Sequence, residues 1–467
     1  MGSHILGKLL FFFTVIILTR LLGVEGFGKF NFSLSFVLIF TVFADLGVNA
    51  FMIREVARKK ELAALYFRNA LLLRVILGAV VYGVIVLTAS LAGYPEDIAE
   101  LVRLIALYGI AESFNGFISA YLRSFERMEY EAFLNVFMKT ALLLSVLFAG
   151  SQGWGLAGIG LVYVAVSFMR LVFGMVIVFS RGFISPGEFL SGKTDIRFIR
   201  SMLSRAWPFA VISVLGVIYY RIDSVMLQSM KGSMAVGWYG AAHRVTGALN
   251  FIPEMFAASL YPVFSRFFIE SREKLETAYP MAFEFLLILG LPLAAGVMVL
   301  SEEITLFLYG QDFLESAAAL RILSWTLLAV FLSYITGTAL NSLNRQKTLT
   351  KISAFCVILN IALNFILIPR YGFPGAALTT LVTSSLMLAL GLFCLEKQRF
   401  SIRYFRILAG PAFAAAGMCF AVFLISGAAL FLRIISGALV YAAIIAATGV
   451  VGRIRREIGS AGGLRGV

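Results

Sequence analysis

Residues 68–92 read RNALLLRVILGAVVYGVIVLTASLA, and only Arg68 and Arg74 in this stretch are charged. An α-helix rises about 1.5 Å per residue, so a run of this length crosses roughly 30 Å of hydrocarbon. Similar apolar runs, separated by short polar breaks, recur along all 467 residues. The pattern predicts an all-α, polytopic membrane protein.

The composition of the whole chain agrees with this interpretation. Hydrophobic residues make up 60% of the sequence and charged residues 14%, with a mean hydropathy of +0.93. A soluble domain carries roughly 25% charged residues, and a single soluble core stops growing at about 250–300 residues. A soluble fold could not bury this much apolar surface, so the solvent of the chain is lipid.

The apolar runs predict about fourteen transmembrane helices joined by short connections, without an extramembrane domain. The expected spans are roughly 5–22, 30–52, 68–92, 99–121, 132–150, 156–180, 206–228, 237–261, 280–300, 317–340, 350–369, 375–395, 406–427 and 431–451.

The formal charge of +14 indicates orientation in the membrane. No basic stripe with interleaved aromatic residues appears, which argues against a nucleic-acid partner. Cations gather in alternate connections, as in 54–60, whereas acids occupy the others, as in Glu96-Asp97 and Glu302-Glu303. Lys and Arg accumulate in cytoplasmic loops. We therefore expect a multi-pass protein of the cell (cytoplasmic) membrane with both termini cytoplasmic.

A short motif repeats six spans apart. GLAGIGL at 155–161 opens the sixth expected span, and GFPGAAL at 372–378 opens the twelfth. An even number of intervening spans gives both copies the same orientation, which is the arrangement of a parallel repeat. We expect an N-terminal six-helix lobe at 1–180, a cytoplasmic linker at 181–205, and a C-terminal six-helix lobe at 206–395. Two additional helices and a cytoplasmic tail then occupy 396–467.

The sequence offers no signature of catalysis or of a bound cofactor. Cys356, Cys394 and Cys419 lie in apolar runs without metal-ligand spacing. No nucleophile–base pair, phosphate loop or metal cluster is visible. We expect no catalytic residue, no cofactor, and no metal besides sodium.

Several ionisable residues lie inside the expected spans, where each costs about 2.5–3.5 kcal/mol on insertion scales. They are Asp45, Arg74, Glu112, Lys139, Arg170, Arg221, Asp223, Arg244, Glu254 and Glu284. For Arg74, Lys139 and Arg170 the simpler interpretation is snorkelling from a position near a span end.

Four basic side chains are candidates for an anion site. Arg221 lies well within the seventh span, His243 and Arg244 lie in the eighth, and Arg20 ends the first. Guanidinium groups bind phosphate bidentately, and a low dielectric strengthens that attraction. The structural alternative is a set of salt bridges between lobes. Asp223, two residues after Arg221, points about 200° away from it on a helix and needs a different partner.

A second group of polar side chains lies in the eleventh and twelfth spans. Asn360 and Asn364 are one helical turn apart, and Thr379 and Thr380 begin the next span. Their oxygens could hold a monovalent cation. Asn and Thr also serve as ordinary interhelical hydrogen-bonding residues, and both interpretations stay open.

Several segments together resemble a known family. They are LTRLLGVEGFG at 18–28, ADLG at 44–47, IREVAR at 53–58, YRID at 220–223 and VGWYGAAHR at 236–244. The chain resembles polysaccharide flippases, the Wzx-like branch of the multidrug, oligosaccharidyl-lipid and polysaccharide exporter superfamily. The resemblance runs through nearly the whole chain and is most specific in the first two and the seventh and eighth spans.

The resemblance implies two six-helix lobes in a V-shape, two extra C-terminal helices, and alternating access to a cationic cavity. By similarity to the branch that flips peptidoglycan precursors, a sodium site would involve Asp223, Asn360, Asn364 and Thr380. Asn364 stands where that branch has an acid, which counts against sodium. His243 replaces the tyrosine more usual before the arginine.

Three functions are therefore considered. The first is a flippase that moves polyprenyl-diphosphate-linked oligosaccharide from the cytoplasmic to the outer leaflet. Its diphosphate would be bound by the basic residues Arg20, Arg54, Arg221, His243 and Arg244. A sodium or proton gradient would be sensed by Asp45 or Asp223. Membrane lipids and glycan assembly proteins are the expected partners.

The second function is a cation-coupled multidrug or metabolite exporter of the same fold. The cavity of such an exporter should be more apolar and acidic, so the basic residues assigned above to an anion site count against it. The third is a membrane glycan polymerase or ligase, which would need a sizeable outer loop, and the outer loops here are short.

Overall fold

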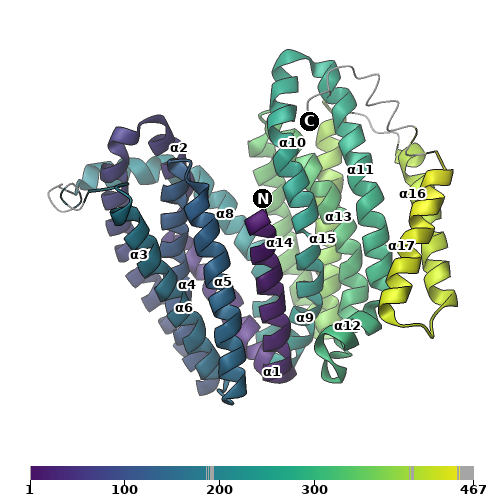
Figure 1. Ribbon diagram of the computed structural model, residues 1–467, viewed down its shortest axis with the longest axis horizontal. Coiled ribbons are helices and arrows are strands. Elements are labelled where there is room, and N and C mark those ends of the chain that lie inside the picture. Colours follow the sequence, from purple (N-terminus) through teal and green to yellow (C-terminus); the bar gives the residue numbers. More distant parts are fainter. Residues whose placement is uncertain are drawn as a thin grey trace. The chain divides into compact units, whose positions relative to one another are not determined.

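The computed structural model describes residues 2–185, 187, 189, 194–398, 400, 404–449 and 452. Every regular element in these residues is a helix, which confirms the all-α prediction. Parts of the expected linker (186, 188 and 190–193) and the expected tail (453–467) lie outside the described residues. The chain divides into two compact units, Met1–Gly237 and Trp238–Val467 (Figure 1). The expected lobes at 1–180 and 206–395 stay a prediction.

The first unit contains the helices up to residue 231. They are α1 (Gly2–Thr41), the 3₁₀ helix η1 (Val42–Ala44), α2 (Val48–Arg58), the 3₁₀ helix η2 (Lys60–Leu62), α3 (Ala63–Leu91), α4 (Glu96–Ser124), α5 (Met128–Ser151), α6 (Leu156–Ser180) and α8 (Ile196–Lys231). The boundary between the two units falls within α9 (Ser233–Leu249).

The second unit contains the remaining helices. They are α10 (Phe251–Glu270), α11 (Arg272–Val299), α12 (Ser301–Tyr309), the 3₁₀ helix η3 (Gln311–Phe313), α13 (Ser316–Ser342), α14 (Gln346–Tyr371), α15 (Phe373–Glu396), α16 (Tyr404–Leu424) and α17 (Leu430–Ala447).

Twelve of the described helices are long and apolar enough to cross a membrane, compared with the fourteen spans expected. The difference has two origins. The first expected span and most of the second lie in α1, which consists of two helical segments joined at Gly23, where φ is 64° and ψ is −177°, so they count as one helix. The expected span 237–261 is divided between α9 and α10 at Asn250. The remaining expected spans each coincide with one helix, and the chain is a multi-pass membrane protein.

The expected span 30–52 is also interrupted, because α1 ends before α2 begins. The interruption contains two residues with positive φ, Leu46 (46°) and Gly47 (75°). A Cβ at Gly47 would lie 2.6 Å from the carbonyl oxygen of Ala206 in α8. Glycine is therefore required at this position both by the left-handed backbone and by the closeness of α8.

Short local signals set several helix ends. Gly155 precedes α6 and Gly372 precedes α15, so both copies of the repeated motif open helices as predicted. Asp195 caps α8 by accepting a hydrogen bond of 2.8 Å from the backbone N–H of Arg197. Such a side-chain cap satisfies a donor that the first turn leaves unpaired.

Each unit has its own apolar contacts. In the first unit, one buried cluster joins α2, α3, α4, α5, α6 and α8 around aromatic residues such as Phe67, Phe117 and Tyr121. In the second, α16 and α17 form the hairpin drawn in yellow and pack on α11 through Leu291, Met418 and Tyr441 (Figure 1). Many large apolar side chains elsewhere are exposed, such as Leu87 and Phe168, as expected of helices that face lipid.

Candidate functional site: buried polar networks in the two units

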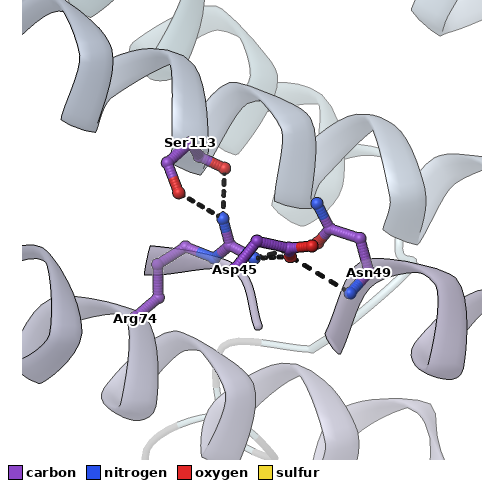
Figure 2. A network of polar contacts seen from close by, with 4 residues as sticks. All are labelled: Asp45, Asn49, Arg74 and Ser113. Carbon is purple, nitrogen blue, oxygen red and sulfur yellow. Dashed lines mark hydrogen bonds and ion pairs between the residues drawn. The ribbon is translucent and has the colours of Figure 1, made fainter. Parts of the chain in front are cut away.

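A buried arginine network joins the interruption after α1 to α3 and α4. Arg74 of α3 is 2% exposed, and its Nη2 donates to Asp45 Oδ1 at 2.6 Å and to Asn49 Oδ1 at 3.0 Å. Its Nη1 donates to the carbonyl oxygen and the Oγ of Ser113, both at 2.5 Å. Figure 2 shows these four residues converging from α2, α3, α4 and the segment that precedes α2.

The network holds both sides of the interruption. The backbone N–H of Asn49 donates to Asp45 Oδ1 at 3.2 Å, so this oxygen caps the start of α2 while it binds Arg74. The Arg74 guanidinium also lies 5.4 Å from the ring centroid of Phe117. The snorkelling interpretation of Arg74 is therefore wrong, because the side chain points into the unit and forms a salt bridge with Asp45 there.

A second network lies between α4 and α6. Glu112 Oε1 accepts hydrogen bonds from Ser167 Oγ at 2.7 Å and from Asn115 Nδ2 at 3.0 Å. Glu112 Oε2 lies 3.5 Å from Arg170 Nη1. Arg170 Nη2 donates to Ser119 Oγ at 3.3 Å. The carboxylate in α4 is thus matched by a guanidinium and two neutral donors.

This second network borders a cavity within the first unit. The residues that line the cavity come from α4, α5 and α6, and they are Tyr108, Glu112, Asn135, Met138, Lys139, Leu142, Tyr163, Val166, Ser167 and Arg170. The Lys139 Nζ lies 4.4 Å from the ring centroid of Phe11 in α1.

The cavity corrects the prediction for two more cations. Within the helix bounds of the structure, Lys139 and Arg170 lie near the middle of α5 and α6. They line a common cavity, so the snorkelling interpretation is wrong for them as well. Ser167 was not singled out from the sequence, because a serine in an apolar helix gives no signal of its own.

The predicted anion-binding residues of the first unit lie on three helices. Arg20 is exposed on α1, shortly before the kink at Gly23. Arg54 of α2 donates to Glu55 Oε1 at 2.9 Å, and its guanidinium lies 5.3 Å from the ring centroid of Phe51. Arg221 of α8 is half-buried, with its guanidinium 5.1 Å from the ring centroid of Tyr220.

Asp223 is buried on α8, with 4% of its surface exposed. The neighbouring Ser224 accepts a hydrogen bond of 3.5 Å from Asn31 Nδ2 of α1. Ser224 thus links α8 to α1. Asp45, the other predicted cation-coupling carboxylate, belongs to the Arg74 network instead.

The predicted residues of the second unit lie on α9, α14 and α15. His243 and Arg244 are half-buried on α9, and the ring of His243 lies 5.8 Å from that of Tyr239. Tyr239 shares a hydrogen bond of 3.2 Å with Thr380. Thr380 of α15 is therefore linked to α9 through Tyr239.

The two asparagines of α14 are joined by a hydrogen bond. Asn364 Nδ2 donates to Asn360 Oδ1 at 3.1 Å, and Asn360 Nδ2 donates to Thr383 Oγ1 at 3.5 Å. Both asparagines and Thr383 are fully buried. The structure pairs Asn360 with Thr383, which the sequence interpretation missed and which lies nearly one turn after Thr380 on α15.

Comparison with known proteins identifies the family. Residues 1–268 match the family model described as polysaccharide biosynthesis protein, which is more than half of the chain. The chain belongs to this family. Residues 208–366 also match the model described as MatE.

Two relatives of low identity match most of the chain. A probable low-salt glycan biosynthesis flippase of Haloferax volcanii is 24% identical over 81% of this chain and 78% of its own length. A putative O-antigen transporter of Escherichia coli is 22% identical over 85% of this chain and 94% of its own length.

Solved structures share the fold. A lipid II flippase in an inward closed conformation superposes with a TM-score of 0.72 at 15% identity, covering 97% of this chain and 98% of that one. An inward-facing multidrug transporter of the MATE family gives a TM-score of 0.70 at 19% identity, covering 84% and 94%. The predicted membrane transporter fold is therefore confirmed.

Proposed function

We propose that this protein is a flippase that moves a lipid-linked oligosaccharide from the cytoplasmic to the outer leaflet of the cell membrane. The observation that carries the proposal is the family match over residues 1–268, together with relatives named as glycan flippases and as an O-antigen transporter. A glycan head group cannot cross hydrocarbon unaided, because each of its hydroxyls would lose its hydrogen bonds to water.

The basic side chains support a diphosphate-linked cargo. Arg20, Arg54, Arg221 and Arg244 are distributed over α1, α2, α8 and α9, and none of them is fully buried. Guanidinium groups bind phosphate oxygens through paired hydrogen bonds, which are strong where water is scarce. We assign the polyprenyl diphosphate to these arginines and to the neighbouring His243.

We further propose that both termini are cytoplasmic and that the chain performs transport without catalysing a covalent step. The distribution of cations between alternate connections supports the orientation. The names of the relatives, which are flippases and transporters, support the absence of an enzymatic role. Glycan assembly proteins remain the proposed partners.

Coupling to a sodium or proton gradient is the final part of the proposal. Asp45 or Asp223 would sense the cation. Of these two carboxylates, Asp45 binds the Arg74 guanidinium at 2.6 Å. A cation at Asp45 would have to displace that guanidinium, and leaving a buried arginine without its carboxylate is costly.

The test uses purified protein in liposomes with a fluorescent polyprenyl-diphosphate oligosaccharide in one leaflet. We expect transfer above that of empty liposomes, and at least tenfold slower transfer in an Arg221→Ala/Arg244→Ala variant. Arg266→Ala/Lys274→Ala, which removes two cations from exposed positions, is the matched control. Transfer equal to that of empty liposomes would exclude the flippase, and unimpaired transfer by the double variant would exclude the arginine assignment.

A second candidate function is the export of drugs or metabolites. It is favoured by the MatE match over residues 208–366 and by the shared fold of the multidrug transporter. The same liposomes loaded with a fluorescent organic cation distinguish the two functions. Efflux of this cation without movement of the lipid-linked oligosaccharide would replace the flippase by an exporter.

A further inference from the structure

Three arginines lie around the contact between α2 and α8 in the first unit. Arg54 and Arg58 belong to the last turns of α2, and Arg205 belongs to α8, next to Ala206. The carbonyl oxygen of Ala206 is an atom that a Cβ at Gly47 would meet at 2.6 Å, so the start of α2 touches the backbone of α8. The side chains of all three arginines are exposed.

Aromatic rings hold Arg54 between the two helices. Its guanidinium lies 5.3 Å from the ring centroid of Phe51 in α2 and 5.8 Å from that of Phe209 in α8. Arg205 precedes Phe209 by four residues, and residues four apart lie on the same face of a helix. Arg205 therefore lies on the face of α8 that contacts Arg54 through Phe209.

The buried Tyr66 of α3 lies near the same charges. Its hydroxyl interacts electrostatically with the Glu55 carboxylate and with the guanidinium groups of Arg205 and Arg54. Charges act strongly on a titratable group only from nearby. Arg54 and Arg205, which come from different helices, therefore belong to one cluster with Glu55.

Glu55 is shared by the two arginines of α2. Its Oε1 accepts a hydrogen bond of 2.9 Å from Arg54 Nε and lies 3.8 Å from Arg58 Nη1. The side chains of Arg54 and Arg58 are 46% and 70% exposed, and ion pairs with exposed partners are weak. The bond to Arg54 uses Nε, so the two Nη groups of this guanidinium are not part of it. An oxyanion with several charges could therefore displace Glu55.

We propose that Arg54, Arg58 and Arg205 bind the diphosphate of the lipid-linked cargo as it enters from the cytoplasmic side, and that Glu55 is the carboxylate that the diphosphate displaces. This inference rests on the proposed function and adds Arg58, Arg205 and Glu55 to it. Guanidinium groups bind phosphate oxygens through paired hydrogen bonds. Because Glu55 competes for the same groups, it lowers the affinity of the entry site and favours onward release of the cargo.

The binding test titrates inorganic pyrophosphate into the purified full-length protein in detergent, at constant ionic strength, and measures the heat of binding. Arg205→Gln is expected to weaken the binding roughly tenfold, as for the loss of one hydrogen bond to a charged group. Arg200→Gln is the matched control, because Arg200 is exposed on the same helix but, five residues before Arg205, lies on a different face. Unchanged affinity in Arg205→Gln, or equal losses in both variants, would overturn the proposal.

A second variant should change the affinity in the opposite direction. Glu55→Gln removes the competing carboxylate and is expected to tighten pyrophosphate binding roughly two- to fivefold, as for the loss of one exposed ion pair. A gain of affinity cannot result from misfolding. Glu129→Gln is the control, because it removes a carboxylate from an exposed pair with Arg127. Unchanged or weaker binding by Glu55→Gln would contradict the proposed displacement.

The head groups of ordinary anionic lipids also carry phosphate, so transfer is measured in two kinds of liposome. In phosphatidylcholine liposomes, Arg205→Gln should raise the concentration of fluorescent polyprenyl-diphosphate oligosaccharide that gives half-maximal transfer. An effect of Arg205→Gln that appears only after phosphatidylglycerol is added would assign the cluster to bilayer lipid and overturn the proposal.

The two measurements also separate the entry site from the flippase function. Pyrophosphate binding that responds to both variants, without any transfer by the unmodified protein, would exclude the flippase but support the phosphate site. Transfer by the unmodified protein, together with normal pyrophosphate binding by Arg205→Gln, would overturn the phosphate site alone.

Discussion

At the scale of single residues, a charged side chain inside a membrane protein needs hydrogen-bonding partners, because no water is there to solvate it. Arg74 has four oxygen acceptors, contributed by Asp45, Asn49 and Ser113. Burying a guanidinium without such acceptors would cost several kcal/mol. Burying the Asp45 carboxylate without its cation would be costly for the same reason. The arginine therefore specifies how α3 packs against the start of α2 and against α4.

Removal of Arg74 should be strongly destabilising. Arg74→Met keeps the length of the side chain but leaves the Asp45 carboxylate without its cation. We expect a loss of about 3 kcal/mol, at the lower end for a broken buried pair because Asp45 is 24% exposed. The measurement is the midpoint of thermal unfolding in detergent.

The control is Arg103→Met, which breaks an exposed pair with Glu96 worth about 0–1 kcal/mol. The double variant Asp45→Asn/Arg74→Met should recover part of the loss, because no unpaired charge is left. Equal midpoints for Arg74→Met and Arg103→Met would show that the network does not stabilise the unit.

The asparagine pair gives a second prediction at this scale. Asn364→Asp introduces a carboxylate next to Asn360 and Thr383, two further oxygen ligands of the kind that hard cations prefer. We expect sodium to raise the unfolding midpoint of this variant. The rise in the unmodified protein should be much smaller. The measurement compares the unfolding midpoint in sodium chloride with that in choline chloride. Asn341→Asp at the end of α13 is the control. Identical midpoints in both salts would remove these residues from the proposed cation site.

At the scale of secondary-structure elements, close helix contacts depend on residues without a side chain. A Cβ at Gly28 of α1 would lie 1.8 Å from the carbonyl oxygen of Ser233 at the start of α9. A Cβ at Gly237 would likewise lie 2.2 Å from the carbonyl oxygen of Val24. The two backbones touch directly, as in other membrane helix pairs built on small residues.

Substitution of Gly28 tests this contact. Gly28→Ala forces α1 and the start of α9 apart, and we expect a loss of about 2 kcal/mol or more from overpacking. Gly83→Ala is the matched control, because Gly83 lies in α3 with open space around its Cα. Unfolding midpoints that fall equally in both variants would contradict the close contact.

At the scale of the whole molecule, the alternation of charges predicts which connections face the cytoplasm. In a variant without native cysteines, single cysteines at Gln152 and Gln311 should react with a membrane-impermeant maleimide added outside intact cells. Cysteines at Lys60 and Gln346 should react only after permeabilisation. All four positions are exposed, and each unit contributes one of each kind.

The reversed pattern of labelling would invert the proposed orientation of both termini. A reversal confined to Gln311 and Gln346 would indicate that an odd number of spans lies between Gln152 and Gln311, where four are expected. The outcome therefore tests the parity of the crossings between Gln152 and Gln311, which helix length alone does not decide for α9 with α10.

The sequence by itself determined the all-helical membrane fold, because the length of an apolar run is a local property that the bilayer thickness converts directly into a span. It also placed Asn360 and Asn364 together, since residues four apart share one face of a helix. Only the tertiary structure decided that Arg74 binds Asp45, that Asn360 bonds Thr383, and that Glu112, Lys139 and Arg170 share a cavity. These contacts depend on how each helix is rotated about its axis relative to its neighbours. That rotation is set by side-chain packing along the full length of several helices, so no single run of residues determines it.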